Sequence, residues 1–293
     1  MKSKYLFPTW GSWVGYVLAI PGFVLGYFNI IQQYEIPGFG LRLRKTNGIF
    51  TPAFENFTNE LAILLVIAGL LLIAFSKSRK EDELNARLRL NALYWGVMTY
   101  YLFYFVGLVF SMSIAEIPFI GDHASELNLF TPLVIFIGRF YYLKYFKKES
   151  YLISEPRFLP HLPFKPVGVV LSLVCLVLTF VFVFSLDDEK WDPVKQVNYL
   201  GLVIGLLLWA FSQHKKEDEM LMQQRLESLQ LAVYINYGLL LVANVLLYSF
   251  SFLYFMLFAQ FSLLLYFVLR MEYVNYKNNR LLTAAEGGMS YEK

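Results

Sequence analysis

The chain has 293 residues, of which 57% are hydrophobic, 18% aromatic and only 16% charged. Soluble domains usually carry about 25% charged residues, so this composition excludes an ordinary water-soluble globular protein. The formal net charge of +3 is small, and no basic patch with interleaved aromatic residues suggests binding to nucleic acid.

Eight apolar runs follow one another along the chain, each near the roughly 20 residues that a bilayer span needs. Their approximate limits are 11–31, 60–76, 92–115, 127–146, 166–186, 197–212, 229–249 and 251–271. The first run is long enough to span and no small-x-small cleavage site follows it, so we expect a retained helix and not a signal peptide. The pattern predicts an all-α, polytopic membrane helix bundle of about eight transmembrane helices.

The basic residues predict the orientation of these helices. With the N-terminus inside the cell, 20 of the 25 Lys and Arg residues fall on the cytoplasmic side. Cytoplasmic loops of membrane proteins carry such an excess. We therefore expect both termini to be cytoplasmic.

The first outer loop, residues 34–58, is the longest polar insertion. Leu41 to Arg44 alternates apolar and basic residues, and Asn47-Gly48 is typical of a type I′ turn before another short apolar run. The pattern predicts a small β-hairpin on the outer face. It is interpreted as a cap over the helix ends, with a ligand lid or a partner contact as the alternatives.

A repeated segment indicates that the chain contains two copies of one unit. Gly69–Leu93 matches Gly205–Leu229 at an offset of 136, with 14 of 25 positions identical. The polar string Lys80-Glu81-Asp82-Glu83 recurs as Lys216-Glu217-Asp218-Glu219, and such a string does not recur merely because membrane helices are rich in leucine.

Two further matches keep the same order along the chain. Arg139-x-x-Tyr142-x-x-Tyr145 recurs as Arg270-x-x-Tyr273-x-x-Tyr276, and Phe7-Pro8 precedes the first run as Leu159-Pro160 precedes the fifth. We expect two four-helix repeats, 1–150 and 151–293, within a single membrane domain. Because four spans is an even number, both copies enter the bilayer in the same direction, as in parallel-repeat proteins.

The motif Phe-Ser-x-x-x-Lys-Glu-Asp-Glu with a downstream Arg-Leu occurs at Phe75–Glu83 with Arg89-Leu90 and again at Phe211–Glu219 with Arg225-Leu226. It resembles the motif of an uncharacterised family of bacterial multi-pass membrane proteins. The resemblance covers both halves and implies a location in the bacterial inner membrane, and it brings no assigned activity.

The charged residues of the repeat form the candidate site. Arg139 lies thirteen residues after Glu126, which corresponds to roughly 20 Å of depth in a core of about 30 Å. One interpretation is that Arg139 and Arg270 reach lipid phosphates beside tyrosines of the interfacial belt. The sharper hypothesis pairs each arginine with the acidic residues of its own copy. The candidate residues are Lys80, Glu81, Asp82, Glu83, Arg89, Arg139, Tyr142, Lys216, Glu217, Asp218, Glu219, Arg225, Arg270 and Tyr273.

Features that would indicate catalysis, a metal or a cofactor are weak in this sequence. The single Cys175 lies in an apolar run and is interpreted as a packed thiol. His123, His161 and His214 share no ligand spacing, and the acidic run beginning at Asp187 has no calcium-ligand pattern. We expect a non-enzymatic protein with no cofactor.

Two functions compete. The first is non-catalytic binding of membrane lipid, a cytoplasmic protein partner or a regulator through the charged cytoplasmic face. The second is transport of an apolar or lipid-like substrate, which the internal repeat favours. The spans carry few charges at mid-depth, whereas ion-coupled transporters commonly hold charged residues there. Asn244, within the seventh run, is interpreted as an interhelical hydrogen bond.

Overall fold

The computed structural model describes residues 5–40, 56–79, 82–113, 120–146, 158–185, 192–214, 219–247 and 249–289. These residues form eight α-helices and one short π-helical segment, and none of them lies in a β-strand. The helices are α1 Gly11–Gln32, α2 Thr58–Phe75, α3 Glu83–Ser113, α4 Ile120–Tyr141 with its π-helical continuation η1 Tyr142–Phe146, α5 Phe164–Ser185, α6 Asp192–Phe211, α7 Glu219–Leu246 and α8 Ser249–Met289. The all-α prediction is confirmed.

Seven of the helices in the described residues are long and apolar enough to cross a membrane. These are α1, α2, α3, α5, α6, α7 and α8, and α4 is not among them. The seven spans support the prediction of a polytopic membrane protein. The predicted eighth span at 127–146 is helical along its whole length, but its crossing of the bilayer stays a prediction.

Several helices extend beyond the predicted apolar runs. α3 begins at Glu83 and α7 at Glu219. Each helix therefore contains a polar segment ahead of its predicted span. α8 has 41 residues, which corresponds to about 60 Å. It continues to Met289 through a polar segment that contains no proline.

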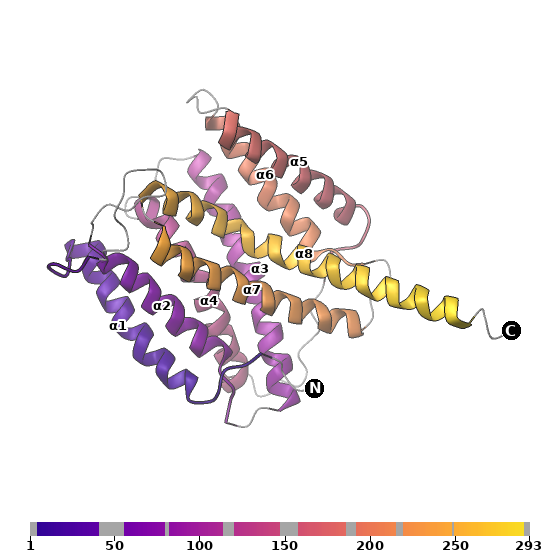
Figure 1. Ribbon diagram of the computed structural model, residues 1–293, viewed down its shortest axis with the longest axis horizontal. Coiled ribbons are helices and arrows are strands. Elements are labelled where there is room, and N and C mark those ends of the chain that lie inside the picture. The colour runs from indigo at the N-terminus through magenta and orange to yellow at the C-terminus, as the bar shows by residue number, and fades with distance from the viewer. Residues whose placement is uncertain are drawn as a thin grey trace. The chain divides into compact units, whose positions relative to one another are not determined.

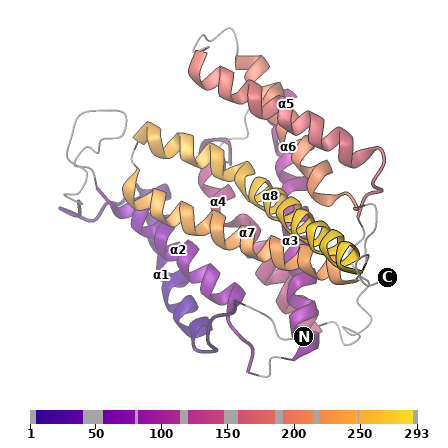
Figure 2. The same cartoon turned by 45° about the vertical axis from the view of Figure 1, so that its right-hand side comes forward.

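The fold contains two compact units, and α7 and α8 contribute residues to both. Unit 1 consists of Met1–Pro156 and Tyr234–Gln260, and unit 2 consists of Arg157–Val233 and Phe261–Lys293. In unit 1, α1 packs along α2 and α4 contacts both α2 and α3. In unit 2, α5 packs along α6. Figures 1 and 2 show α1 alongside α2, and α5 alongside α6, from two directions.

Small residues bring α1 and α2 into close contact in unit 1. A Cβ atom placed on Gly15 would lie 2.7 Å from the Gly69 carbonyl oxygen, and one placed on Gly69 would lie 2.6 Å from the Ala19 nitrogen. Membrane helices pack closely where small residues face each other, because dispersion contacts must replace the hydrophobic effect.

The same contact recurs between α5 and α6 in unit 2. A Cβ on Gly168 would lie 2.5 Å from the Trp209 nitrogen and 2.9 Å from the Gly205 oxygen. Gly205 in turn faces Ser172, and Gly201 faces Cys175. Cys175 is buried at this crossing, as a packed thiol.

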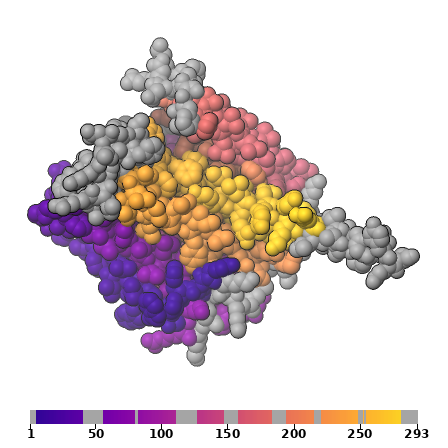
Figure 3. All heavy atoms as spheres, viewed as in Figure 1, coloured from indigo at the N-terminus to yellow at the C-terminus, as the bar shows by residue number. Residues whose placement is uncertain are grey.

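The outward sides of α1 and α5 are apolar. Large exposed side chains include Trp13, Val17 and Ile20 on α1 and Val170, Val177 and Phe180 on α5. Figure 3 shows the α5 side chains at the surface, next to the C-terminal half of α8. Such surfaces are unfavourable in water and are typical of helices that face lipid.

The predicted outer hairpin falls mostly on residues 41–55, outside the described residues. At its base, Gly40 and Asn56 form an isolated antiparallel bridge. Asn56 and Thr58 bind the Ile36 backbone at distances of 2.7 and 2.9 Å. Residues 40 and 56, on either side of this segment, therefore lie next to each other. The hairpin itself stays a prediction.

Candidate functional site

The charged residues before α3 have local structural roles. Asp82 Oδ1 accepts a hydrogen bond of 2.8 Å from the Asn85 backbone nitrogen, which makes Asp82 the N-cap of α3. Glu83 pairs with Arg87 one turn later at 3.2 Å. Lys80, Glu81, Lys216, Glu217 and Asp218 lie outside the described residues, and Glu219 is described in its backbone alone.

Arg89 is a buried cation at the end of α2. Its side chain is 2% exposed. Nη1 donates to the Ser76 carbonyl at 2.8 Å and approaches the Ala74 carbonyl at 3.5 Å. The guanidinium carbon lies 4.9 Å from the centre of the Phe140 ring. A cation is stabilised here because the last carbonyls of a helix have no partners within the helix and carry partial negative charge.

Arg225 makes the same contacts at the end of α6. It is also 2% exposed, and its Nη1 donates to Ser212 at 2.9 Å and to Ala210 at 3.4 Å. Its guanidinium carbon lies 4.1 Å from the Phe158 ring centre. Both arginines were candidates from the sequence, and the structure gives them equivalent positions. We call the carboxyl end of α2, with Arg89, the capped end of unit 1, and the carboxyl end of α6, with Arg225, the capped end of unit 2.

The remaining end carbonyls of α2 and α6 are also bound in matching ways. In unit 1, the Phe7 nitrogen donates to Phe75 and the Lys77 nitrogen donates back to Phe7, both at 2.9 Å. In unit 2, Leu159 takes the place of Phe7, with Phe211 and Gln213 as partners at 2.8 Å. Serine hydroxyls complete each cap, Ser76 to Leu72 at 2.5 Å and Ser212 to Trp209 at 3.2 Å.

Arg139 and Arg270 lie against aromatic rings. The guanidinium carbon of Arg139 is 5.4 Å from the Trp95 ring centre, and that of Arg270 is 5.5 Å from the Tyr273 ring centre. Both side chains are partly exposed. Among the described residues Arg139 makes no ion pair. Because Glu81 and Glu217 are not described, the hypothesis that these arginines pair with the acidic residues stays a prediction.

Unit 2 has a polar cluster at its capped end that no sequence motif indicated. Lys165, on the first turn of α5, pairs with the Glu272 carboxylate on α8 at 2.8 Å. The same carboxylate oxygen accepts a hydrogen bond of 3.1 Å from Trp209 Nε1 on α6. Lys165 Nζ also lies 3.0 Å from His214 Nδ1, just after α6. Three helices and a loop therefore bring four polar side chains together.

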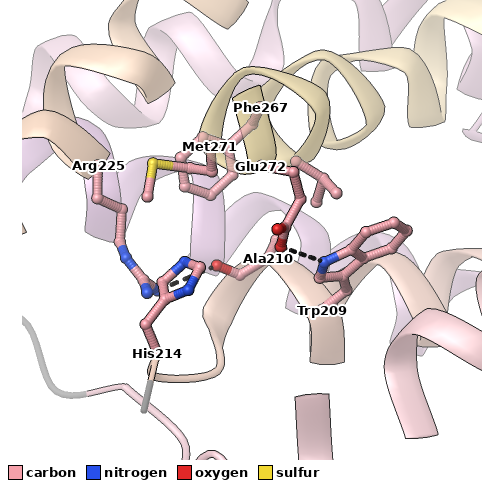
Figure 4. Close-up of a pocket in the computed structure, with 8 residues that line it drawn as sticks. Trp209, Ala210, His214, Arg225, Phe267, Met271 and Glu272 are labelled. Carbon is pink, nitrogen blue, oxygen red and sulfur yellow. Dashed lines mark hydrogen bonds between the residues drawn. The ribbon is translucent and has the colours of Figure 1, made fainter. Parts of the chain in front are cut away.

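Trp209, His214 and Glu272 of this cluster line a small pocket, shown in Figure 4. Its empty volume is about 200 Å³, including open solvent at its mouth. The lining residues are Trp209, Ala210, His214, Arg225, Phe267, Val268, Met271 and Glu272. In Figure 4 the Glu272 carboxylate turns toward the Trp209 indole, and the His214 ring lies beside the Arg225 guanidinium.

His214 is held in its neutral form. Burial and the neighbouring positive charges of Lys165 and Arg225 lower the pKa of His214 to about 4. Because a lysine ammonium can only donate, Nδ1 of His214 is the acceptor in the contact with Lys165. The imidazole is thus an acceptor within a predominantly cationic cluster.

Unit 1 has different chemistry at the corresponding place. Tyr141, which follows Arg139 at the same spacing as Glu272 follows Arg270, places its hydroxyl 3.1 Å from the Tyr16 hydroxyl. Lys144 donates to Ser78 at 2.9 Å. A pair of hydroxyl groups therefore replaces the ion pair of unit 2, and only unit 2 has an ion pair at this place in the part of the chain that is described.

A second polar cluster lies within the apolar helices of unit 1. Tyr101 donates to the Gln260 carbonyl at 2.8 Å, and Tyr104 bonds to the Gln260 side chain. Asn244 donates to the Glu60 carbonyl at 2.7 Å, which confirms the predicted interhelical hydrogen bond. Tyrosines and a glutamine in apolar runs give no spacing signal, so the Gln260 cluster was missed from the sequence.

Within the described residues, no three His, Cys, Asp or Glu side chains come together in a way that could hold a metal ion. No known protein family, curated protein or solved structure matches the chain. Seven apolar helices of membrane-spanning length define the class, which is a multi-pass integral membrane protein. The resemblance to bacterial multi-pass proteins stays a prediction.

Proposed function

We propose that the chain consists of two parallel four-helix repeats in a bacterial inner membrane, with both termini cytoplasmic. The equivalent contacts of Arg89 and Arg225 support the duplication. So do the equivalent glycine contacts of Gly15 and Gly168. In this topology both capped ends face the cytoplasm.

We propose further that the protein binds membrane lipid, without catalysis, at the cytoplasmic capped ends. The observation that carries this proposal is the concentration of basic side chains there. Exposed Lys77 and Arg79 follow the end of α2 in unit 1, and unit 2 has Lys165 at its capped end and exposed Lys277 and Arg280 on α8. Basic side chains near the inner surface attract anionic lipids by about 1 kcal/mol each.

Native mass spectrometry of the protein purified in a mild detergent tests this proposal. We expect phospholipid to remain bound, with anionic lipid enriched over its share of the membrane extract. Retention of a protein in place of lipid would favour the cytoplasmic-partner alternative. A preparation that is folded but retains neither lipid nor protein would contradict the proposal.

Transport of a lipid-like substrate is a second candidate because of the buried Tyr101, Tyr104 and Gln260 cluster. Polar side chains inside membrane helices often mark a substrate path. Translocation of a fluorescent phospholipid across reconstituted vesicles is the test. Gln223→Leu, in the polar segment at the start of α7, is the control. Loss of transport in Gln260→Leu but not in Gln223→Leu would favour this function.

A further inference from the structure

The Lys165 and Trp209 side chains form an anion site that an internal carboxylate occupies. Both groups donate to one oxygen of Glu272, at 2.8 and 3.1 Å. Convergent charge-assisted donors of this kind bind carboxylates and phosphates alike. The lysine side chain is only 13% exposed, whereas the Glu272 side chain is 36% exposed. The donors are thus fixed within the protein, while their acceptor reaches the surface.

The position of this site suits a lipid phosphate. Lys165 lies on the first turn of α5, and Trp209 lies on the last turns of α6. Both helices are apolar enough to span the membrane, so their ends lie at the depth of lipid headgroups. The exposed apolar surface of α5, next to α8 in Figure 3, offers a path for acyl chains. Basic pockets between membrane helices are known sites for anionic headgroups.

We propose that the phosphate of an anionic phospholipid displaces the Glu272 carboxylate and binds Lys165 and Trp209, at one site per chain. This inference rests on the proposed lipid-binding function and names its ligand class and its site. In the described part of unit 1, Tyr141 and Tyr16 form a hydroxyl pair at the corresponding place instead of this site. Glu272 then acts as an internal competitor of the lipid.

Native mass spectrometry with added lipid tests the site. The purified protein is mixed with phosphatidylglycerol or with phosphatidylcholine, and the bound fraction is compared. We expect preference for phosphatidylglycerol. Lys165→Gln should weaken this binding about tenfold, as loss of one charge-assisted hydrogen bond predicts. Glu272→Gln should strengthen it, because the competing charge is removed. Lys195→Gln, at the opposite end of α6 from Trp209, is the matched control and should leave binding unchanged.

Two further variants separate binding from folding. Trp209→Phe keeps the ring and removes only the N–H donor, and it should weaken phosphatidylglycerol binding. Lys165→Arg keeps the charge and should retain binding even if Lys165→Gln fails to fold. Thermal midpoints identify any unfolded variant. Weaker binding in folded Glu272→Gln, or equal binding in all folded variants, would overturn the proposal.

Inorganic phosphate distinguishes a lipid from a soluble ligand. We expect millimolar phosphate to leave phosphatidylglycerol bound. Displacement of the lipid by phosphate, with the same dependence on Lys165, would assign the site to a soluble phosphate and overturn its lipid assignment. Absence of any bound lipid in the unmodified protein would count against the proposed function itself. Retained lipid that is insensitive to Lys165 would count against this site alone.

Discussion

Arg89 and Arg225 hold positive charge at buried positions. Each donates to carbonyls at the end of a neighbouring helix. When a buried carbonyl loses its hydrogen-bond donor, the folded protein is destabilised by the full desolvation free energy of that carbonyl. Lysine keeps the charge, but its compact ammonium cannot reproduce the planar contact of the guanidinium with the Phe140 and Phe158 rings.

We therefore predict that Arg89→Gln and Arg225→Gln each lower the free energy of unfolding by about 2–4 kcal/mol. The Lys variants should recover only part of this loss. Thermal unfolding in detergent is the measurement, and Arg87→Gln is the control because Arg87 is exposed and pairs with Glu83 one turn away. Losses no larger than that of the control would contradict the capping role.

His214 predicts a pH dependence of stability. Its pKa is lowered to about 4 in the folded protein, against about 6.5 for an unperturbed histidine. Between these values the unfolded chain binds more protons, so stability falls as the pH falls from about 6.5 toward 4. The groups that influence the ring are Lys165, Arg225, Glu272 and His161.

Melting temperatures measured at several pH values between 7.5 and 4.5 check this effect. The unmodified protein should lose stability across that window, and His214→Gln should lose less. His161→Gln is the control. An equal pH dependence in all three proteins would show that other groups cause it.

At this scale the sequence indicated the arginines but not their function. The repeat identified Arg89 and Arg225 as candidates, but the sequence argument concentrated on Arg139 because of its expected depth in the membrane. The sequence pattern does not show which neighbouring helix end a side chain reaches, so the capping role of Arg89 and Arg225 was not predicted. The pocket could not be predicted at all. Lys165, Trp209, His214 and Glu272 come from separate segments and share no motif.

The α1–α2 and α5–α6 pairs depend on glycine at their crossing points. A methyl group on Gly15 or Gly168 would meet backbone atoms at 2.7 Å and 2.5 Å respectively. Backbone cannot rotate away as a flexible side chain can, so the helices must separate.

We predict that Gly15→Ala and Gly168→Ala each destabilise the protein by about 1–3 kcal/mol. Gly26→Ala, also on α1, is the matched control because its Cβ would meet nothing nearer than Ala62 at 3.8 Å. That variant should be neutral or stabilising, since alanine favours a helix. Thermal unfolding of the three variants in one detergent tests this prediction. Similar midpoints for all three would contradict close packing at these crossings.

Helix existence was predictable because about 20 apolar residues in a row have few alternatives in a membrane. Helix length was less so. The extension of α8 to Met289 passes through a polar segment, where hydrophobicity gives no signal. α4 was predicted as a span from its apolar run. Polar residues such as Thr131 and Arg139 reduce its mean hydropathy, although the chain there is helical.

The orientation proposed for the whole chain rests on the distribution of basic residues, and labelling tests it. In a Cys175→Ser background, we predict that Lys77→Cys and Gln213→Cys react only with a reagent that has reached the cytoplasm. Tyr34→Cys should react with an impermeant reagent added outside intact cells. Labelling of positions 77 and 213 from opposite sides would contradict the parallel repeat.

The arginine caps also impose an order on assembly. α2 emerges from the ribosome before Arg89, which lies only 13 residues beyond the Ser76 carbonyl that it binds. Until α3 follows, the Ser76 carbonyl depends on water for the hydrogen bond that Arg89 later donates. We therefore expect each helix pair to settle fully into the bilayer only when its successor arrives. A ribosome stalled when α2, but not Arg89, has left the exit tunnel should hold a nascent chain whose second span is still easily extracted.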